Sequence, residues 1–190
     1  MSRGLRAWVG ALLALGCLTA LAEPQDDAWA ALRSGQAALL LRNANAPGAG
    51  DPAGFQLQDC RTQRNLDAQG RRDAQQWGQL LRRHWIEGPR IYAGRWCRTQ
   101  ETALELGLGA VETLDALDYF DGDLAAAKRL RQRVSQLPRG LPLVLVTHGV
   151  NIGALAGITP VPGEAVIVAM PIGEPPRVLA RVLARVPAPH

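Results

Sequence analysis

The segment LPLVLVTHGVNIGAL, residues 141–155, carries the strongest strand signal in the chain and a polar residue directly after it. Residues 141–147 form a continuous apolar run rich in β-branched side chains, which is typical of a strand inside a parallel sheet. His148 follows this run, and a short helix is predicted over residues 151–157. The segment therefore predicts a buried strand that is followed by a histidine and then by a helix.

The same alternation of strands and helices extends along the rest of the chain. Further strands are predicted at residues 37–41, 90–93, 165–170 and 178–186. Helices are predicted over residues 26–33, 66–85, 98–106 and 123–137. Residues 43–64, rich in Gly, Pro, Asn and Asp, predict a long loop, and residues 107–121 a mostly irregular connection. We expect one α/β domain, a three-layer sandwich with a mainly parallel central sheet.

Polar residues directly follow three of the predicted strands. They are Arg42-Asn43, Gly94-Arg95 with Arg98 beyond, and His148. In open α/β sheets, ligands bind in the crevice outside the carboxyl ends of the strands. We therefore expect these residues, which are distant in sequence, to meet in one pocket.

The residue types in this group suit a phosphate ester. Arginine gives a planar, bidentate grip on phosphate oxygens, and the start of a helix adds backbone donors, as predicted for Arg98. His148 is suited to hold a phosphoryl oxygen or to move a proton. Taken singly, an arginine at a strand end is most often a solvated surface group and a lone histidine is more often structural. The combination is what indicates a phosphate site.

Four segments of the chain resemble the signatures of the histidine phosphatase (phosphoglycerate mutase-like) superfamily, in the order in which that family has them. They are LLLRNANAPG at 39–48, TQRNLDAQG at 62–70 with Arg71, GRWCRTQETA at 94–103 and VLVTHGVNIGAL at 144–155. Together they lie within residues 37–170. The resemblance implies a phosphoglycerate mutase-like fold and a phosphate pocket lined by Arg42, Arg98 and His148.

The sequence departs from the family at the nucleophile. Active members carry a histidine that becomes transiently phosphorylated, and the matching residue here is Asn43. The lone pair of an amide nitrogen is delocalised, so Asn43 is no substitute nucleophile, although it can still donate a hydrogen bond to a phosphoryl oxygen. His84, within a predicted helix, and His190, at the end of the chain, do not look like replacements.

The resemblance also implies an acidic proton donor between the second and third strand-end signatures. The acidic residues in that interval are Glu112, Asp115, Asp118 and Asp121. Asp115 and Asp118 are the preferred candidates, and a solvated loop face is the alternative interpretation for this run. The insert at residues 49–64, with Phe55, either shapes substrate choice or forms a tethered rim.

Two functions from different classes remain. The first is a phosphomonoesterase that binds and hydrolyses small phosphate monoesters, and the alternative is a non-catalytic phosphate-binding pseudophosphatase. The expected partner is a small phosphorylated substrate or inorganic phosphate, with no cofactor and no metal, since the sequence has no GxxxxGK[ST], CxxC or HExxH motif. A net charge of +4 without a basic, aromatic stripe argues against nucleic acid. The sequence makes no prediction of oligomeric state.

The N-terminus reads as a signal peptide over residues 1–22, followed by one domain at residues 23–190. Arg3 and Arg6 precede an apolar run from 7 to 21, and Ala20-Leu21-Ala22 has the pattern of a signal peptidase site. A lipoprotein signal ending at Cys17 is an alternative, although Ala14 stands where such signals usually have leucine. We expect a periplasmic or secreted protein without stable membrane insertion of the mature domain.

Cleavage after Ala22 would remove Cys17 and leave Cys60 and Cys97. An oxidising compartment permits a disulfide between these two residues, and two separate buried thiols are the alternative.

Intact-mass analysis of the protein from its native envelope is expected to show Glu23 as the first residue, because the small-x-small pattern ends at Ala22. A lipid-modified Cys17, or an uncleaved chain that starts at Met1 in the cytoplasm, would contradict this prediction.

Overall fold

The computed structural model describes residues 24–184, so the predicted signal peptide at residues 1–22, the lipoprotein alternative at Cys17 and the chain end at His190 lie outside it. Six strands form one sheet in the order β3-β2-β4-β1-β5-β6. Their bounds are β1 Ala37–Arg42, β2 Arg90–Ala93, β3 Val111–Thr113, β4 Leu143–Thr147, β5 Glu164–Ala169 and β6 Val178–Leu183. The predicted strands are all present.

The sheet is mixed, and its parallel part is the part that presents polar residues. β3, β2, β4 and β1 run parallel to one another, whereas β5 pairs antiparallel with both β1 and β6. Arg42 of β1 lies opposite Thr147 of β4, and Ala93 of β2 lies opposite Val146. The residues that follow these three strands therefore emerge side by side at one edge of the sheet.

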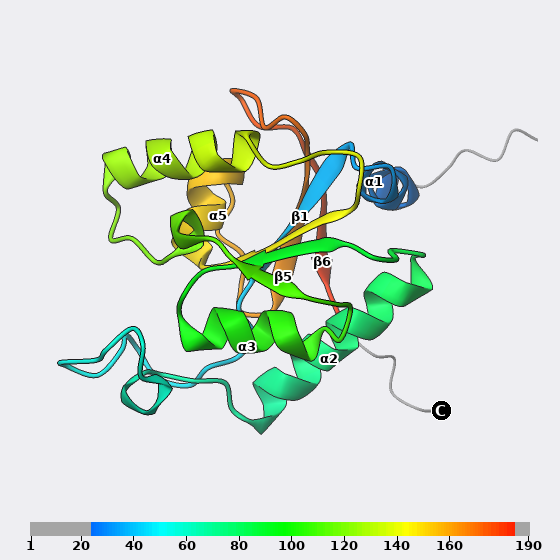
Figure 1. The fold of residues 1–190 in the computed structure, drawn as a ribbon. Helices are drawn as coiled ribbons and strands as arrows, with labels where there is room; N and C mark the ends of the chain where they lie inside the picture. The colour runs from blue at the N-terminus through cyan, green and yellow to red at the C-terminus, as the bar shows by residue number, and fades with distance from the viewer. Residues whose placement is uncertain (1–23, 185–190) are drawn as a thin grey trace, which may run out of the picture.

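Helices cover both faces of the sheet (Figure 1). α1 (Pro24–Arg33), α2 (Ala68–Arg83) and α3 (Cys97–Glu105) pack on one face. α4 (Leu124–Ser135) and α5 (Gly149–Ala156) pack on the other. The three-layer α/β sandwich predicted from the sequence is confirmed.

Alternate residues of β1 supply two separate cores. Leu39 and Leu41 pack with Trp77 and Leu81 on the side of α2, and Leu40 packs with Ile152 of α5 on the opposite side. Because both faces are covered, the central strands need apolar side chains at every position. This requirement explains the unbroken apolar runs in the sequence.

The connection at residues 107–121 contains more structure than expected. β3 pairs with β2 at the sheet edge, and a 3₁₀ turn spans Asp115–Leu117. β3 has only three residues, two of them polar and exposed, because its outer edge faces solvent. Such a short edge strand lacks the apolar alternation that identifies strands in a sequence.

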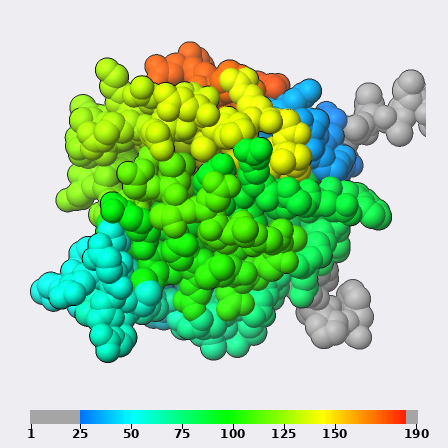
Figure 2. Space-filling model, in the orientation of Figure 1, coloured from blue at the N-terminus to red at the C-terminus, as the bar shows by residue number. Residues whose placement is uncertain are grey.

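Residues 43–59 form the predicted long loop, followed by a 3₁₀ turn at Cys60–Thr62. In Figure 2 the cyan segment around residues 50–60 stands out from the body of the molecule. Cys60 and Cys97 are joined by a disulfide with a Cα–Cα distance of 5.7 Å, so the predicted pairing is confirmed. The bond fixes the end of the loop to the start of α3.

Gly70 ends the segment at residues 62–70, which resembles the start of the family's first long helix, and there is a steric reason for a glycine at this position. A Cβ at this position would lie 2.1 Å from the backbone oxygen of Asn45, far inside contact distance. Only glycine lets the first turn of α2 approach the chain that leaves β1. The start of α2 thereby holds the loop next to the site.

Candidate functional site

A cavity of about 370 Å³ opens at the carboxyl edge of the sheet. Its lining includes Arg42, Asn43, Arg98 and His148, so the structure brings together four residues that the sequence singled out. They come from the ends of β1 and β4 and from the first turn of α3. The parallel register of the central strands is what makes them neighbours.

Arg42 lies at the end of β1 with its guanidinium group against the start of α5. Its Nη1 donates to the backbone oxygen of Pro160 at 2.6 Å. A Cβ at Gly149 would lie 3.4 Å from the Arg42 Cζ, so the small residue after His148 leaves room for this arginine. Burial lowers the pKa of Arg42, and the nearby charge of Arg64 adds to this. Arginine remains charged in proteins, so Arg42 supplies a fixed positive charge.

Arg98, in the first turn of α3, is only 3% exposed. Burial lowers its pKa, and the adjacent carboxylate of Asp51 acts in the opposite direction. Its Nε is buried without a hydrogen-bond partner in the protein. A buried guanidinium donor left unpaired is costly, and a ligand oxygen in the cavity would satisfy it.

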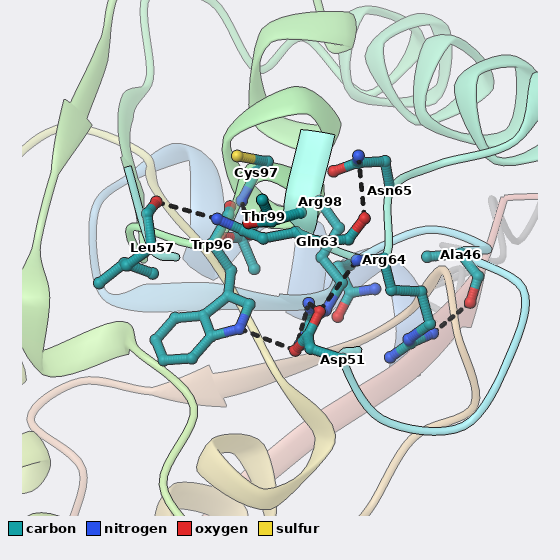
Figure 3. A network of polar contacts seen from close by, with 12 residues as sticks. Ala46, Asp51, Leu57, Gln63, Arg64, Asn65, Trp96, Cys97, Arg98 and Thr99 are labelled. Carbon is teal, nitrogen blue, oxygen red and sulfur yellow. Dashed lines mark hydrogen bonds and ion pairs between the residues drawn. The ribbon is translucent and has the colours of Figure 1, made fainter. Parts of the chain in front are cut away.

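Asp51, in the long loop, is the residue that sequence reasoning missed. Its carboxylate accepts hydrogen bonds from Arg98 Nη1 at 2.9 and 3.1 Å and from Trp96 Nε1 at 3.0 Å (Figure 3). It also accepts from the backbone N–H of Arg64 at 3.0 Å. Burial alone would raise the pKa of Asp51, but these donors and the charge of Arg98 lower it overall. Asp51 is therefore a fixed anion and a poor proton donor.

Arg64, Trp96 and Tyr119 were also not identified as site residues from the sequence, whereas Phe55 was named there as part of the insert at residues 49–64. Arg64 donates to the backbone oxygen of Ala46 and contributes a third guanidinium group to the cavity. Phe55, Trp96 and Tyr119 surround the opening. Trp96 stands two residues before Arg98, and this proximity was the one signal in the sequence that could have identified Trp96 as a site residue.

His148 is the N-cap residue of α5 and is 4% exposed. Its ring contacts those of Trp96 and Tyr119 edge-on, each with ring centroids 5.6 Å apart. Burial, with the charge of Arg98, lowers the pKa of His148 from the usual 6.5 to about 3. The imidazole is therefore neutral near pH 7, and its Nε2 is buried without a partner. A neutral imidazole offers one donor and one acceptor to a ligand.

Asn43 is buried and lines the cavity directly after β1. Its backbone N–H donates to Thr147 and its Nδ2 donates to the backbone oxygen of Ala44 at 3.0 Å. His84 does not line this cavity, since it stacks on Trp29 at the end of α2 with centroids 4.0 Å apart. Within residues 24–184, His148 is the only histidine in the cavity lining.

The two acidic residues preferred as proton donors do not line the cavity. Asp115 is exposed and lies beside a different hollow, next to Arg129 and Arg133. The Asp118 carboxylate accepts from the backbone N–H and the Nε of Arg95, both at 2.6 Å, which ties this connection to the end of β2. Glu112 and Asp121 are exposed. Within residues 24–184, Asp51 is the only carboxylate in the cavity lining. The donor role of Asp115 or Asp118 stays a prediction.

Two further features bear on function. In the described part of the chain, no three His, Cys, Asp or Glu side chains group closely enough to hold a metal ion. Among the helices between residues 24 and 184, none has the length and apolar character needed to cross a membrane.

The arrangement of sheet, helices and strand-end pocket defines a phosphoglycerate mutase-like α/β protein. No family model matches the sequence, and no curated protein matches it significantly. Solved structures do match. The protein histidine phosphatase SixA complexed with tungstate superposes with a TM-score of 0.56 at 17% identity, over 78% of this chain and 97% of that chain.

Two other solved structures are similar. A putative phosphohistidine phosphatase SixA from Nakamurella multipartitia has a TM-score of 0.54 and 21% identity, covering 80% of this chain and 98% of its own. A histidine-to-alanine mutant of phosphoserine phosphatase from Entamoeba histolytica, in complex with phosphoserine, has a TM-score of 0.53 and 13% identity, covering 76% and 95%. The chain has the histidine phosphatase fold, as its sequence motifs predict.

The low pKa of His148 predicts a pH dependence of stability. The unfolded chain takes up a proton near pH 6.5 and the folded chain only near pH 3, so the unfolding free energy falls as the pH drops between these values. The slope should approach about 1.4 kcal/mol per pH unit. Denaturant unfolding at several pH values should show this slope.

A His148→Asn variant should lose that contribution, because asparagine does not titrate. A His84→Asn variant, changed at the histidine outside the cavity, should keep it. Equal slopes in the natural chain and in His148→Asn would show that His148 is not held neutral.

Proposed function

We propose that this protein is an exported relative of the histidine phosphatases that binds phosphate monoesters in the strand-end pocket, with little or no hydrolysis of its own. The observation that carries the proposal is a set of three buried, unpartnered nitrogens, Arg64 Nε, Arg98 Nε and His148 Nε2, on residues lining one cavity. Buried polar atoms are almost always paired, so three such nitrogens around one charged pocket support a site that accepts the oxygens of a polar ligand.

The charge of the pocket fits a phosphate monoester. Arg42, Arg64 and Arg98 are positive, Asp51 is negative and His148 is neutral, which leaves two net positive charges around the cavity. A phosphate monoester carries between about 1.5 and 2 negative charges at pH 7. The two net positive charges of the pocket therefore match the two negative charges of a phosphate monoester dianion.

The start of α5 adds backbone donors to this site. Gly149 and Val150 line the cavity at the helix N-terminus, where the first N–H groups have no partner inside the helix. Helix N-termini favour phosphate and similar anions. The tungstate bound to SixA and the phosphoserine bound to the phosphatase mutant are oxyanion ligands of proteins with this fold.

Asn43 bears on the choice between a phosphomonoesterase and a non-catalytic pseudophosphatase. A histidine phosphatase forms and breaks a bond to its nucleophilic imidazole, and an asparagine amide cannot replace that step. What remains is direct attack by water on a phosphoryl group held by the arginines, and His148, with its pKa lowered to about 3, is only a weak base for that step. Asn43 therefore favours the pseudophosphatase, and slow hydrolysis is the second candidate.

Two features support the proposal that the protein is exported. The N-terminal pattern of residues 1–22 is that of a signal peptide, and the Cys60–Cys97 disulfide is of a kind found mostly in oxidising compartments. The proposed ligands are accordingly phosphate esters of the periplasm or the surroundings of the cell.

Binding is tested first, by thermal unfolding with inorganic phosphate or vanadate. At an anion concentration 100 times the Kd, the fold should gain about 2.7 kcal/mol, which raises the Tm by roughly 5–10 °C for a chain of this size. Arg42→Ala and Arg98→Ala should abolish the shift, because each removes a guanidinium group from the cavity.

Arg61→Ala is the matched control, since Arg61 also pairs with an aspartate of the long loop, Asp59, but is exposed and outside the cavity. Its shift should equal that of the natural chain. A full shift in Arg98→Ala would refute the assignment of the pocket.

Activity is tested with p-nitrophenyl phosphate. The natural chain should retain only a residual rate, by analogy with nucleophile removal in the serine protease triad, which leaves roughly 10³–10⁴-fold catalysis over water. Asn43→His restores an imidazole at the base of the pocket and should raise the rate by several orders of magnitude.

Asn45→His places the same side chain two residues further along the loop, where Asn45 binds Asp67, and should leave the rate unchanged. If the natural chain hydrolyses the ester as fast as Asn43→His, position 43 is not the nucleophile position and the proposed mechanism fails.

A further inference from the structure

The pocket has two chemically different halves. Its base is charged and buried, with Arg98 3% and His148 4% exposed. Its rim is aromatic and open, with Phe55 37% and Tyr119 47% exposed and Trp96 between them. A phosphate ester that places its phosphoryl group at the base must direct the rest of the molecule to the rim.

The rim residues form one wall although they come from three separate segments. Phe55 belongs to the long loop, Trp96 precedes α3 and Tyr119 follows the 3₁₀ turn at Asp115–Leu117. Ring centroids are 5.9 Å apart for Phe55 and Trp96 and 6.4 Å apart for Trp96 and Tyr119. These are the distances of interacting aromatic pairs, so a further ring would find several partners here.

Trp96 is fixed in place by the phosphate-binding half of the site. Its indole N–H donates to Asp51, and Asp51 in turn binds Arg98 (Figure 3). Because the only polar group of the indole is used, Trp96 presents apolar ring surface to a ligand. Phe55 has no polar group at all, so the rim suits a flat apolar group better than a chain of hydroxyl groups.

A cation is a poor occupant for this rim. Aromatic walls also bind quaternary ammonium groups, but the Arg98 guanidinium already lies 5.9 Å from the centre of the Trp96 ring. Two more arginines line the same cavity. A positive ligand group would meet like charge, whereas a neutral ring would not.

The size of the cavity limits the ligand. Ligand pockets span roughly 300–1,000 Å³, and this one, at about 370 Å³, is near the lower end. It has room for a phosphoryl group and one ring.

We propose that the pocket selects phosphate monoesters whose alcohol part is a single aromatic or heteroaromatic ring, with Phe55, Trp96 and Tyr119 as the specificity-determining residues. The inference rests on the proposed function for the phosphate half of the site. It adds the class of ester that the rim recognises.

The test is a set of Kd values measured by calorimetry on the natural chain, with inorganic phosphate, ethyl phosphate, phosphocholine and phenyl phosphate as probes. Phenyl phosphate should bind about tenfold more tightly than ethyl phosphate, a difference equivalent to ~1.4 kcal/mol, which is the scale of aromatic contacts. Phosphocholine should bind no better than ethyl phosphate.

Variants of the rim separate ring recognition from phosphate binding. Phe55→Leu should bring the ratio of the phenyl and ethyl phosphate Kd values closer to one and leave the Kd for inorganic phosphate unchanged, because the Phe55 ring contacts Trp96 at the rim rather than His148 at the base. Trp85→Leu removes an aromatic side chain that is 73% exposed and lies outside the cavity, and it should keep the tenfold ratio.

Equal binding of phenyl and ethyl phosphate, tighter binding of phosphocholine, or an unchanged ratio in the rim variant would overturn this inference alone. Failure of all four probes to bind would overturn the proposed function, and the inference with it.

Discussion

The buried ion pair between Asp51 and Arg98 is the interaction on which the site depends. Arg98 lies in the first turn of α3 and is almost fully buried. Burial of an unpaired guanidinium group there would carry a high desolvation cost. Asp51 offsets that cost from a loop 47 residues away in the sequence. Removing either partner of such a pair typically costs about 3–5 kcal/mol, because the other charge is left buried.

The same pair organises the loop. The Asp51 carboxylate accepts hydrogen bonds from the indole N–H of Trp96 and from the backbone N–H of Arg64. One carboxylate therefore positions residues of both halves of the pocket. The Cys60–Cys97 disulfide and the hydrogen bond from the Cys97 N–H to Gln63 Oε1 fix the other end of the loop to α3. The loop is thus held at two points, with the cavity between them and the sheet.

The fold and half of the site follow from local features of the sequence. A buried strand followed at once by a polar residue is visible without knowledge of the structure, and this pattern located Arg42, Asn43 and His148. Parallel register then requires these residues to meet, as it does between Arg42 and Thr147. The α/β sandwich needed only the alternation of apolar strands and helices.

The rest of the site depends on contacts that no local pattern records. Asp51 stands in a Gly- and Pro-rich segment with no periodicity, and its partner Arg98 belongs to another element. Asp115 and Asp118 lie in the interval that the family resemblance indicates, but one points to solvent and the other binds Arg95. The order of strands and helices along the chain indicates which elements lie next to one another. The conformation of the loops determines which of their side chains reaches the cavity.

The charged lining of the pocket consists of groups that keep their state near neutral pH. Three guanidinium groups do not titrate there, the pKa of Asp51 is lowered, and the imidazole of His148 is held neutral by burial. A phosphate monoester, in contrast, loses its second proton near pH 6. Between about pH 5 and 8 the free pocket therefore presents the same charge to an ester, while the ester itself changes its charge by loss of a proton.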